Sequence, residues 1–143
     1  MELSPSVLLR ASLNLDRAGV EARLHLRDAK DLPFEENTFD AVIGAPVLEH
    51  LDDPFARLSE MVRVLKPGAP LVVVVTRRGV PDAPWRPKWH PEHIAQDQLM
   101  LGMEGAGLID VRAYPLLTCS PLARRTGVAG VGFKEGVWQW SDT

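Results

Sequence analysis

The sequence of 143 residues is poor in cysteine, tyrosine and long hydrophobic runs. Its single cysteine, Cys119, excludes an internal disulfide and is typical of a chain in a reducing compartment. No apolar run reaches the roughly 20 residues that a transmembrane helix needs. The first residues also lack a basic segment followed by an unbroken apolar stretch, the pattern of a signal peptide. These observations predict a cytoplasmic protein with no membrane partner.

An excess of charge of one sign is also missing. The 16 Lys and Arg residues nearly balance the 19 Asp and Glu residues, which gives a net charge of −3. Nucleic-acid-binding domains usually carry a basic patch, so no nucleic-acid partner is expected. The composition, with 45% hydrophobic and 24% charged residues, is that of an ordinary globular protein. The length suits one domain, and we expect it to span residues 1–143.

Proline and glycine, by contrast, are frequent and mark the ends of the expected helices. Ser4-Pro5 and Asp53-Pro54 each combine a capping side chain with a proline at the first helical position. Gly19 suits the left-handed position that ends the first helix. The "KPG" that follows residue 65 ends the second helix, because proline does not continue a helix. A third helix is expected over residues 92–105.

Strands are expected near residues 22–26, 41–44, 71–75 and 108–113. The run "LVVVV" is continuously apolar, as in parallel strands covered on both faces. "GVWQW" near the C-terminus is a candidate for a last strand. Alternation of helices and strands predicts an α/β fold that is Rossmann-like, with a mostly parallel sheet and helices on both faces. The strands at 41–44 and 71–75 are expected to be adjacent and parallel.

In such sheets, ligands bind beyond the carboxyl ends of the strands. Three places in the sequence meet this description: Asp28 and Ala29 after "ARLHL", Ala45 after "DAVIG", and Thr76 after "LVVVV". Residues 28–69 carry three motifs in succession, "DAKDLPF", "TFDAVIGAPVLEHL" and "VLKPGA". Together these motifs resemble the class I S-adenosylmethionine-dependent methyltransferases of the small-molecule type. Ala69 departs mildly from the family, which usually has a second glycine there.

The resemblance implies that S-adenosyl-L-methionine is the cofactor and assigns residues to it. Asp28 matches the acidic residue that accepts a hydrogen bond from the adenine amino group, and the backbone of Ala29 matches the reader of the adjacent ring nitrogen. Leu32 and Phe34 would form an apolar wall near the base. Glu2, in "MELSP", matches the acidic residue that holds the ribose hydroxyls, a task suited to a carboxylate.

Ala45, Glu49 and His50 follow the strand where substrate and methyl group meet in this family. Ala45 would contact the cofactor. His50 is a candidate general base because its reference pKa lies near physiological pH, and Glu49 is a second candidate; in the alternative interpretation, "LEHL" packs at the start of a helix. No catalytic residue is assigned, because methyl transfer by direct displacement depends largely on alignment. No metal site is expected.

The family's first strand and its G-x-G-x-G loop precede the acidic residue that Glu2 matches. Only Met1 precedes Glu2, so we expect a domain that is N-terminally truncated relative to the family and needs upstream residues for full activity. The glycines of "GVAGVG", residues 127–132, are interpreted as a flexible turn before the last strand rather than as a substitute loop.

Two alternatives to a small-molecule methyltransferase stay open. One is a non-catalytic, methyltransferase-like module with a scaffolding or regulatory role. The other is one half of a split methyltransferase. The unpaired strand edges left by a missing first strand are open to pairing with another chain. We therefore also expect that a homodimer or a partner chain completes the sheet.

Overall fold

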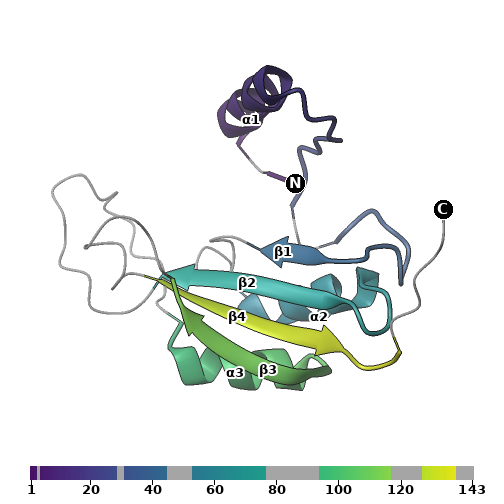
Figure 1. Ribbon diagram of the computed structural model, residues 1–143, viewed down its shortest axis with the longest axis vertical. Coiled ribbons are helices and arrows are strands. Elements are labelled where there is room, and N and C mark those ends of the chain that lie inside the picture. The colour runs from purple at the N-terminus through teal and green to yellow at the C-terminus, as the bar shows by residue number, and fades with distance from the viewer. Residues whose placement is uncertain (3, 29–30, 45–52, 77–93, 117–126, 138–143) are drawn as a thin grey trace, which may run out of the picture. The chain divides into compact units, whose positions relative to one another are not determined.

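A computed structural model describes residues 1–2, 4–28, 31–44, 53–76, 94–116 and 127–137 (Figure 1). The chain forms two compact units, Met1–Pro33 and Phe34–Thr143, which are called unit 1 and unit 2. Among the described residues, no helix is both long enough and apolar enough to cross a membrane.

Unit 1 contains the helix α1 (Pro5–Ala18). Ser4 Oγ accepts a hydrogen bond from the amide of Val7 at 3.4 Å, and a proline occupies the first helical turn. Gly19 ends the helix in the left-handed conformation, with φ of 64°, and its amide donates to the Asp16 carbonyl. Both ends of the first predicted helix are therefore confirmed.

The strand predicted over residues 22–26 is not formed. Leu26 pairs with Glu2 in an isolated parallel bridge, and the residues before it have no strand assignment. Leu24 and Leu26 are 36% and 50% exposed, so their alternation does not bury one face. A strand needs hydrogen-bond partners along its length, and the described part of unit 1 offers residues 22–26 a partner at one position.

Unit 2 is built on a four-stranded sheet with the order β1-β2-β4-β3 (Figure 1). The strands are β1 (Val42–Gly44), β2 (Pro70–Thr76), β3 (Leu108–Pro115) and β4 (Gly127–Lys134). β1 and β2 are adjacent and parallel, as predicted, with Ile43 opposite Val72. β4 runs antiparallel to both of its neighbours, so three of these four strands point the same way.

The glycine-rich segment forms the interior strand β4, so its interpretation as a flexible turn was wrong. A β-carbon added at Gly130 would lie 2.7 Å from Met103 Sδ and 3.1 Å from Leu99 Cδ2. The glycine is required because a helix packs closely over the strand. A last strand was also predicted at "GVWQW", residues 136–140. The prediction is wrong for Gly136 and Val137, which follow β4 and belong to no strand. Residues 138–140 lie outside the described residues.

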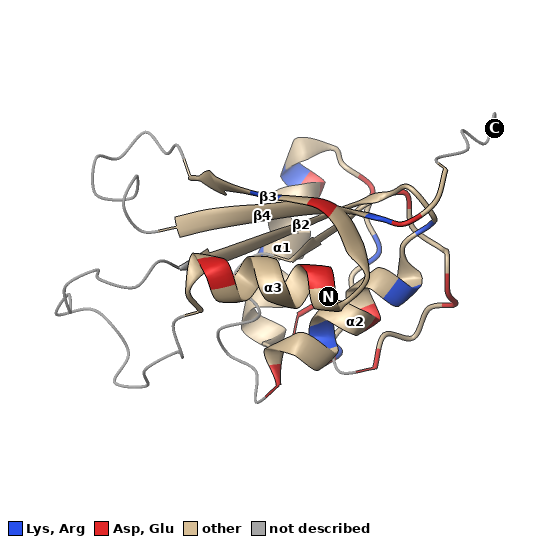
Figure 2. Ribbon diagram, turned by 90° about the horizontal axis from the view of Figure 1, so that it is seen from below, with Lys and Arg blue, Asp and Glu red and all other residues tan. Residues whose placement is uncertain are grey.

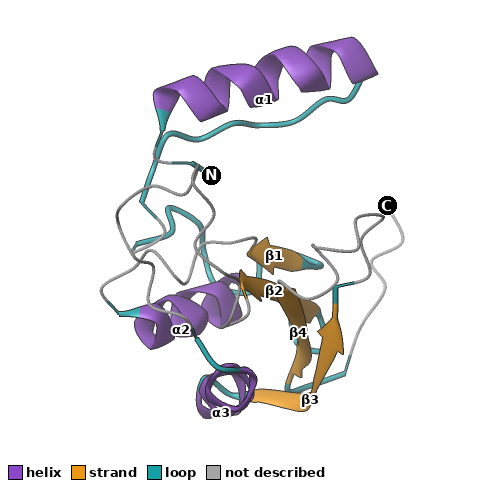
Figure 3. Ribbon diagram, turned by 90° about the vertical axis from the view of Figure 1, so that its left-hand side faces the viewer, coloured by secondary structure: helices purple, strands orange, loops and turns teal. Residues whose placement is uncertain are grey.

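The helices α2 (Pro54–Val64) and α3 (Gln96–Gly105) both cover one face of this sheet (Figure 3). α2 begins at the predicted cap, where Asp53 Oδ1 accepts from the Ala56 amide at 3.0 Å. α3 carries acidic but no basic residues, whereas α2 carries both (Figure 2). The shared core contains fully buried side chains from the helices and from β2, among them Leu58, Leu99, Met103, Leu71, Val73 and Val75.

On the opposite face of the sheet, several apolar side chains of the described residues of unit 2 are exposed. Residues of this face lie side by side across the strands, since Ile43 is level with Val72 and Val131, and Phe133 with Ile109. Ile43 is 71% exposed and Phe133 is 39% exposed. In unit 2 the two described helices thus cover a single face of the sheet.

Candidate functional site

Two chain segments that carry residues predicted to bind the cofactor meet in unit 1. The amide of Glu2 donates to the His25 carbonyl at 3.1 Å, and the amide of Arg27 donates to the Glu2 carbonyl at 3.2 Å. These bonds form the parallel bridge between Glu2 and Leu26. Asp28 comes two residues after Leu26 and is half-buried. The fold of unit 1 therefore pairs the backbone of Glu2 with the segment that leads to Asp28.

The Glu2 carboxylate is anchored by the chain that enters α1. Glu2 Oε1 accepts a hydrogen bond from the amide of Ser4 at 2.9 Å. Ser4 is itself the N-cap of α1, so the carboxylate is attached to the start of a helix. A carboxylate has about four lone-pair sites, and a backbone anchor of this kind fixes its orientation. Such a pre-set carboxylate suits recognition of paired hydroxyl groups.

The remaining predicted site residues fall into two groups. Leu32 is buried, with 9% of its surface exposed, which fits an apolar contact. Ala29, Ala45, Glu49 and His50 lie outside the described residues. Their predicted roles stay predictions.

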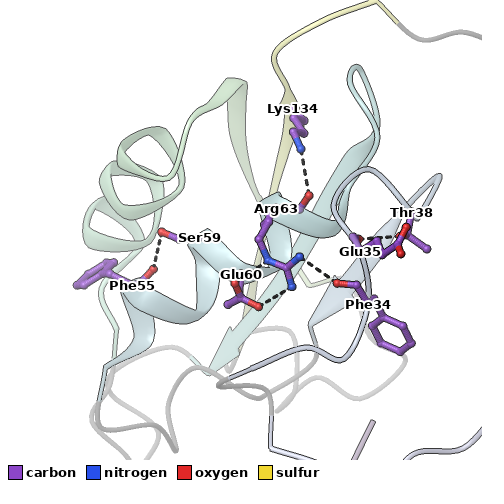
Figure 4. Close-up of polar contacts among 8 residues, drawn as sticks. All are labelled: Phe34, Glu35, Thr38, Phe55, Ser59, Glu60, Arg63 and Lys134. Carbon is purple, nitrogen blue, oxygen red and sulfur yellow. Dashed lines mark hydrogen bonds and ion pairs between the residues drawn. The ribbon is translucent and has the colours of Figure 1, made fainter.

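A second well-defined feature is the loop over residues 34–39 of unit 2, which lies against the end of α2 (Figure 4). The amides of Thr38 and Phe39 both donate to the Val64 carbonyl, at 2.8 and 2.9 Å. The ring of Phe34 meets that of Phe39 edge to face, with centroids 4.9 Å apart and planes at 87°. Both rings are half-buried, so this aromatic pair is fixed and accessible at once.

Arg63, on the last turn of α2, joins this loop to the helix. Its Nε and Nη2 donate to the two carboxylate oxygens of Glu60 at 2.8 and 3.0 Å, and its Nη1 donates to the Phe34 carbonyl at 2.9 Å (Figure 4). A two-point arginine–carboxylate pair holds the guanidinium plane in one orientation. Sequence reasoning missed Arg63, although the spacing of Glu60 and Arg63 is that of a helical ion pair.

Lys134, at the end of β4, was also missed. Its ammonium group donates to the Leu65 carbonyl at 2.8 Å, to the Arg63 carbonyl at 3.2 Å and to Asn37 Oδ1 at 2.8 Å. It therefore binds the carbonyl end of α2 and the 34–39 loop together. No local signal announces this contact, because Lys134 and Asn37 are 97 positions apart.

Asp40, in the "FD" pair that precedes β1, forms an ion pair with Lys66, which follows α2. Its Oδ1 lies 2.7 Å from Lys66 Nζ, and both side chains are largely open to solvent, at 66% and 36% exposure. Phe39, the other member of the pair, forms a parallel bridge with Leu65. The pair thus connects the start of β1 to the end of α2.

Other features of the described surface do not coincide with the predicted site. The described residues contain no group of three or more His, Cys, Asp or Glu side chains suited to a metal ion. A shallow hollow of about 230 Å³ lies between α1 and the segment that follows it in unit 1. It is lined by Ser12, Leu15, Asp16, Val20, Glu21, Ala22 and Leu24, none of which is a predicted ligand.

Comparison with known proteins identifies a family. The family described as "Methyltransferase domain" matches residues 1–73, just over half of the chain. The matched region continues across the boundary between unit 1 and unit 2. It includes the bridge between Glu2 and Leu26, the 34–39 loop and most of β2.

Curated relatives and a solved structure agree with this match. The chain is 39% identical over 92 residues to the demethylmenaquinone methyltransferase of Lactiplantibacillus plantarum, covering 62% of this chain and 38% of that protein. It is 35% identical over 74 residues to norajmaline N-methyltransferase of Rauvolfia serpentina, covering 50% of this chain and 25% of that protein. The chain thus spans well under half the length of each of these relatives.

Among solved structures, an S-adenosylmethionine-dependent methyltransferase from Thermotoga maritima superposes with a TM-score of 0.68 at 20% identity. The superposition covers 88% of this chain and 70% of that one. At this level of identity the likeness concerns the fold. The predicted Rossmann-like α/β fold is confirmed.

Proposed function

The chain belongs to the methyltransferase-domain family, and from this premise we propose that it provides the adenosine-binding part of an S-adenosylmethionine-dependent methyltransferase that acts on a small organic acceptor. The observation that carries the proposal is the bridge between Glu2 and Leu26, which joins the two segments with acidic side chains. We propose that residues 1–143 form a single methyltransferase-like domain; the family match over residues 1–73, which runs from unit 1 into unit 2, supports this.

In this proposal the two carboxylates recognise opposite ends of the adenosine. Asp28 accepts a hydrogen bond from the amino group of adenine, and Glu2 accepts hydrogen bonds from the ribose hydroxyls. The contact of Glu2 Oε1 with the Ser4 amide supports this role, because it orients the carboxylate before the ligand arrives. Buried Leu32 is proposed to provide apolar surface for the base. The Ala29 backbone is proposed to read the adjacent ring nitrogen.

The chemistry requires little from the side chains beyond alignment. When bound, S-adenosylmethionine would supply a methyl group on a positively charged sulfur: the acceptor nucleophile would bond to the methyl carbon as the carbon–sulfur bond breaks, and neutral S-adenosylhomocysteine would leave. Holding the adenosine end limits the orientations of the rest of the cofactor, and such ordering can account for much of a rate enhancement. Ala45 is proposed to contact the cofactor. Glu49 and His50 are the proposed candidates for proton removal from an acceptor that needs it.

The acceptor class rests on the relatives. Their names specify demethylmenaquinone and norajmaline as the molecules on which they act. Both are small organic compounds, which supports a small organic acceptor for this chain as well.

We further propose that firm binding of the methionine end needs a glycine-rich loop of the family type. Only glycine allows backbone to approach a ligand that closely without a β-carbon in the way. The glycines of β4 do not supply such a loop, since they lie inside the sheet, where Gly130 packs against α3. The outer edge of β1 has no partner strand among the described residues. A strand that brings the loop would find its hydrogen-bond partners there.

The decisive experiment replaces Asp28 and measures cofactor affinity by isothermal titration with S-adenosylhomocysteine. Loss of a hydrogen bond to a charged acceptor costs about 1–3 kcal/mol, so Asp28→Ala should weaken binding by roughly 5- to 150-fold. The matched control is Asp31→Ala, because Asp31 is exposed, carries the same charge and lies three residues away. It should change affinity by less than about twofold.

A base analogue makes the assignment specific. S-inosylhomocysteine carries a carbonyl where adenine has its amino group, so it presents an acceptor to Asp28 and should bind poorly to the wild-type protein. Asp28→Asn offers an amide donor and should narrow the difference between the two ligands. Equal affinities of wild-type protein for both ligands, with the fold intact by circular dichroism, would remove Asp28 from the adenine site.

A further inference from the structure

Two large apolar side chains on α2 and α3 are exposed close to each other. Phe55, in the first turn of α2, is 47% exposed, and Leu101, in the middle of α3, is 67% exposed. The ring of Phe55 lies over Gly102 of α3, because a β-carbon added at Gly102 would overlap it. Leu101 directly precedes Gly102, so both side chains lie at the same part of α3.

The exposed charges around these two side chains are acidic. Asp97 comes four residues before Leu101 and Glu104 three residues after it, so both lie on the same side of α3 as Leu101. Asp53 caps α2 two residues before Phe55. All three carboxylates are exposed, and α3 carries no basic residue (Figure 2).

Neither arginine of α2 neutralises these carboxylates. Arg57 is buried, and Arg63, in the last turn of the helix, is held by the Glu60 carboxylate at 2.8 and 3.0 Å. The three carboxylates therefore leave an acidic surface around Phe55 and Leu101.

Glu104 occupies a position that the helix itself disfavours. It lies in the last turn of α3, where the carbonyl groups give the helix end a partial negative charge. Among the described residues, Glu104 has no ion-pair partner that would offset this cost. A positive charge brought by another molecule would find a carboxylate here that the rest of the described chain does not use.

From these observations we propose that Phe55, Leu101, Asp53, Asp97 and Glu104, called the α2–α3 patch, form a docking surface for a basic amphipathic helix of a partner protein. The apolar side of that helix would cover Phe55 and Leu101, and lysine or arginine side chains on its flanks would face the carboxylates. The proposal goes beyond the proposed function, because no residue of the α2–α3 patch is proposed to bind the cofactor.

The charge of the patch selects among possible occupants. A second copy of the chain would bring the same carboxylates to the same place, and like charges that face each other oppose association. An anionic lipid surface and a nucleic acid would be repelled for the same reason. Because only two large apolar side chains are presented, the interface is expected to be small and the complex short-lived.

The test uses the chain of 143 residues, labelled with nitrogen-15, and a designed peptide. The peptide has about 15 residues, the length at which an isolated helix begins to be stable, with leucines along one face and lysines on both flanks. Two matched peptides replace the lysines by glutamates or the leucines by serines. Titration followed by nuclear magnetic resonance should show the largest shifts in the first turn of α2 and in α3. The first peptide should bind at least about tenfold more tightly than either matched peptide.

Two variants of the patch, each with a matched control after β4, test the two kinds of contact. Leu101→Ser should weaken binding of the lysine peptide by about five- to tenfold. Val137→Ser removes a side chain that is 80% exposed and should change the affinity by less than about twofold. Glu104→Lys should weaken binding by at least about fivefold, whereas Glu135→Lys, with the same change of charge, should stay within about twofold.

Stability separates loss of the surface from loss of the fold. Glu104→Lys places a cation at the end of α3, where the helix favours one, so its melting temperature should equal or exceed that of the wild-type protein. Weaker peptide binding in a variant that is at least as stable would therefore support docking at this surface. Raising the salt concentration from about 50 to about 300 mM should weaken binding several-fold.

Three results would overturn the proposal. The first is peptide-induced shifts that are spread over the chain instead of centred on α2 and α3. The second is equal binding of the lysine and glutamate peptides, including no binding of either. The third is a Leu101→Ser variant that binds as well as Val137→Ser.

Discussion

Lys134 offers the sharpest test of how unit 2 is held together, through the substitution Lys134→Met. Its ammonium group donates to the carbonyls of Leu65 and Arg63 and to Asn37 Oδ1, at 2.8, 3.2 and 2.8 Å. These contacts link the end of β4 to the end of α2 and to the 34–39 loop. Methionine keeps an apolar stem of similar length, so the substitution mainly removes the three hydrogen bonds and the charge.

The expected loss of stability follows from counting acceptors. The Arg63 carbonyl also accepts a hydrogen bond from the Asn37 amide at 3.1 Å, so this carbonyl keeps a partner when the hydrogen bond from Lys134 is lost. Hydrogen bonds from a charged donor contribute about 1.5–3 kcal/mol each when well shielded. A cation at a helix C-terminus contributes about 0.3–1 kcal/mol. Because Lys134 is half-buried, water can hydrogen-bond to the carbonyl groups that lose the lysine and offset part of the cost. We expect the free energy of unfolding to fall by about 2 kcal/mol.

Thermal unfolding followed by circular dichroism measures this loss, with Lys66→Met as the matched control. A loss of about 2 kcal/mol lowers the melting temperature by roughly 6–10 °C in a chain of this size. Lys66 pairs with Asp40 at 2.7 Å, but the two side chains are 36% and 66% exposed. Such a pair contributes about 0–1 kcal/mol and is screened by salt. The role assigned to Lys134 would be refuted if both variants lowered the melting temperature equally. It would also be refuted if the effect of Lys134→Met on the melting temperature disappeared in 1 M salt.

Two other outcomes are expected. Gly130→Ala should destabilise the protein by about 1–2 kcal/mol, because the new β-carbon would crowd Met103 and Leu99, which are fully buried. In the control Gly105→Ala the β-carbon meets open space, so stability should stay unchanged or rise by up to about 1 kcal/mol. Chemical denaturation that finds Gly105→Ala less stable than Gly130→Ala would contradict the packing of α3 on β4. The chain of 143 residues should bind S-adenosylmethionine more weakly than the same chain joined to a strand and glycine-rich loop of the family; calorimetric affinities that do not differ would show that the loop is not needed.

Local chemistry determined most of what was predicted correctly. The caps at Ser4 and Asp53 and the glycine at position 19 define helix ends through contacts within a few residues, so they can be read directly. The apolar run of β2 identifies a strand at the core, where Leu71, Val73 and Val75 are buried. The parallel neighbours β1 and β2 were predicted because a helix connects them.

Tertiary contacts decided the rest. Whether "VEARLHL" became a strand depended on a partner of matching length, and the described part of unit 1 pairs it at Leu26. Whether "GVAGVG" became a turn or a strand depended on β2 and β3, between which it pairs, and α3 leaves no space for a β-carbon at Gly130.

In the candidate site, too, some features could be predicted from the sequence and others depend on the folded structure. The types of residue that would recognise adenosine, at Glu2 and Asp28, are visible in the sequence, because they follow from the chemistry of the ligand. The pairing of Glu2 with Leu26 and the attachment of Phe34 to Arg63 are decided in the folded chain. Contacts between distant positions depend on the path of the whole chain, and a sequence pattern carries no record of that path.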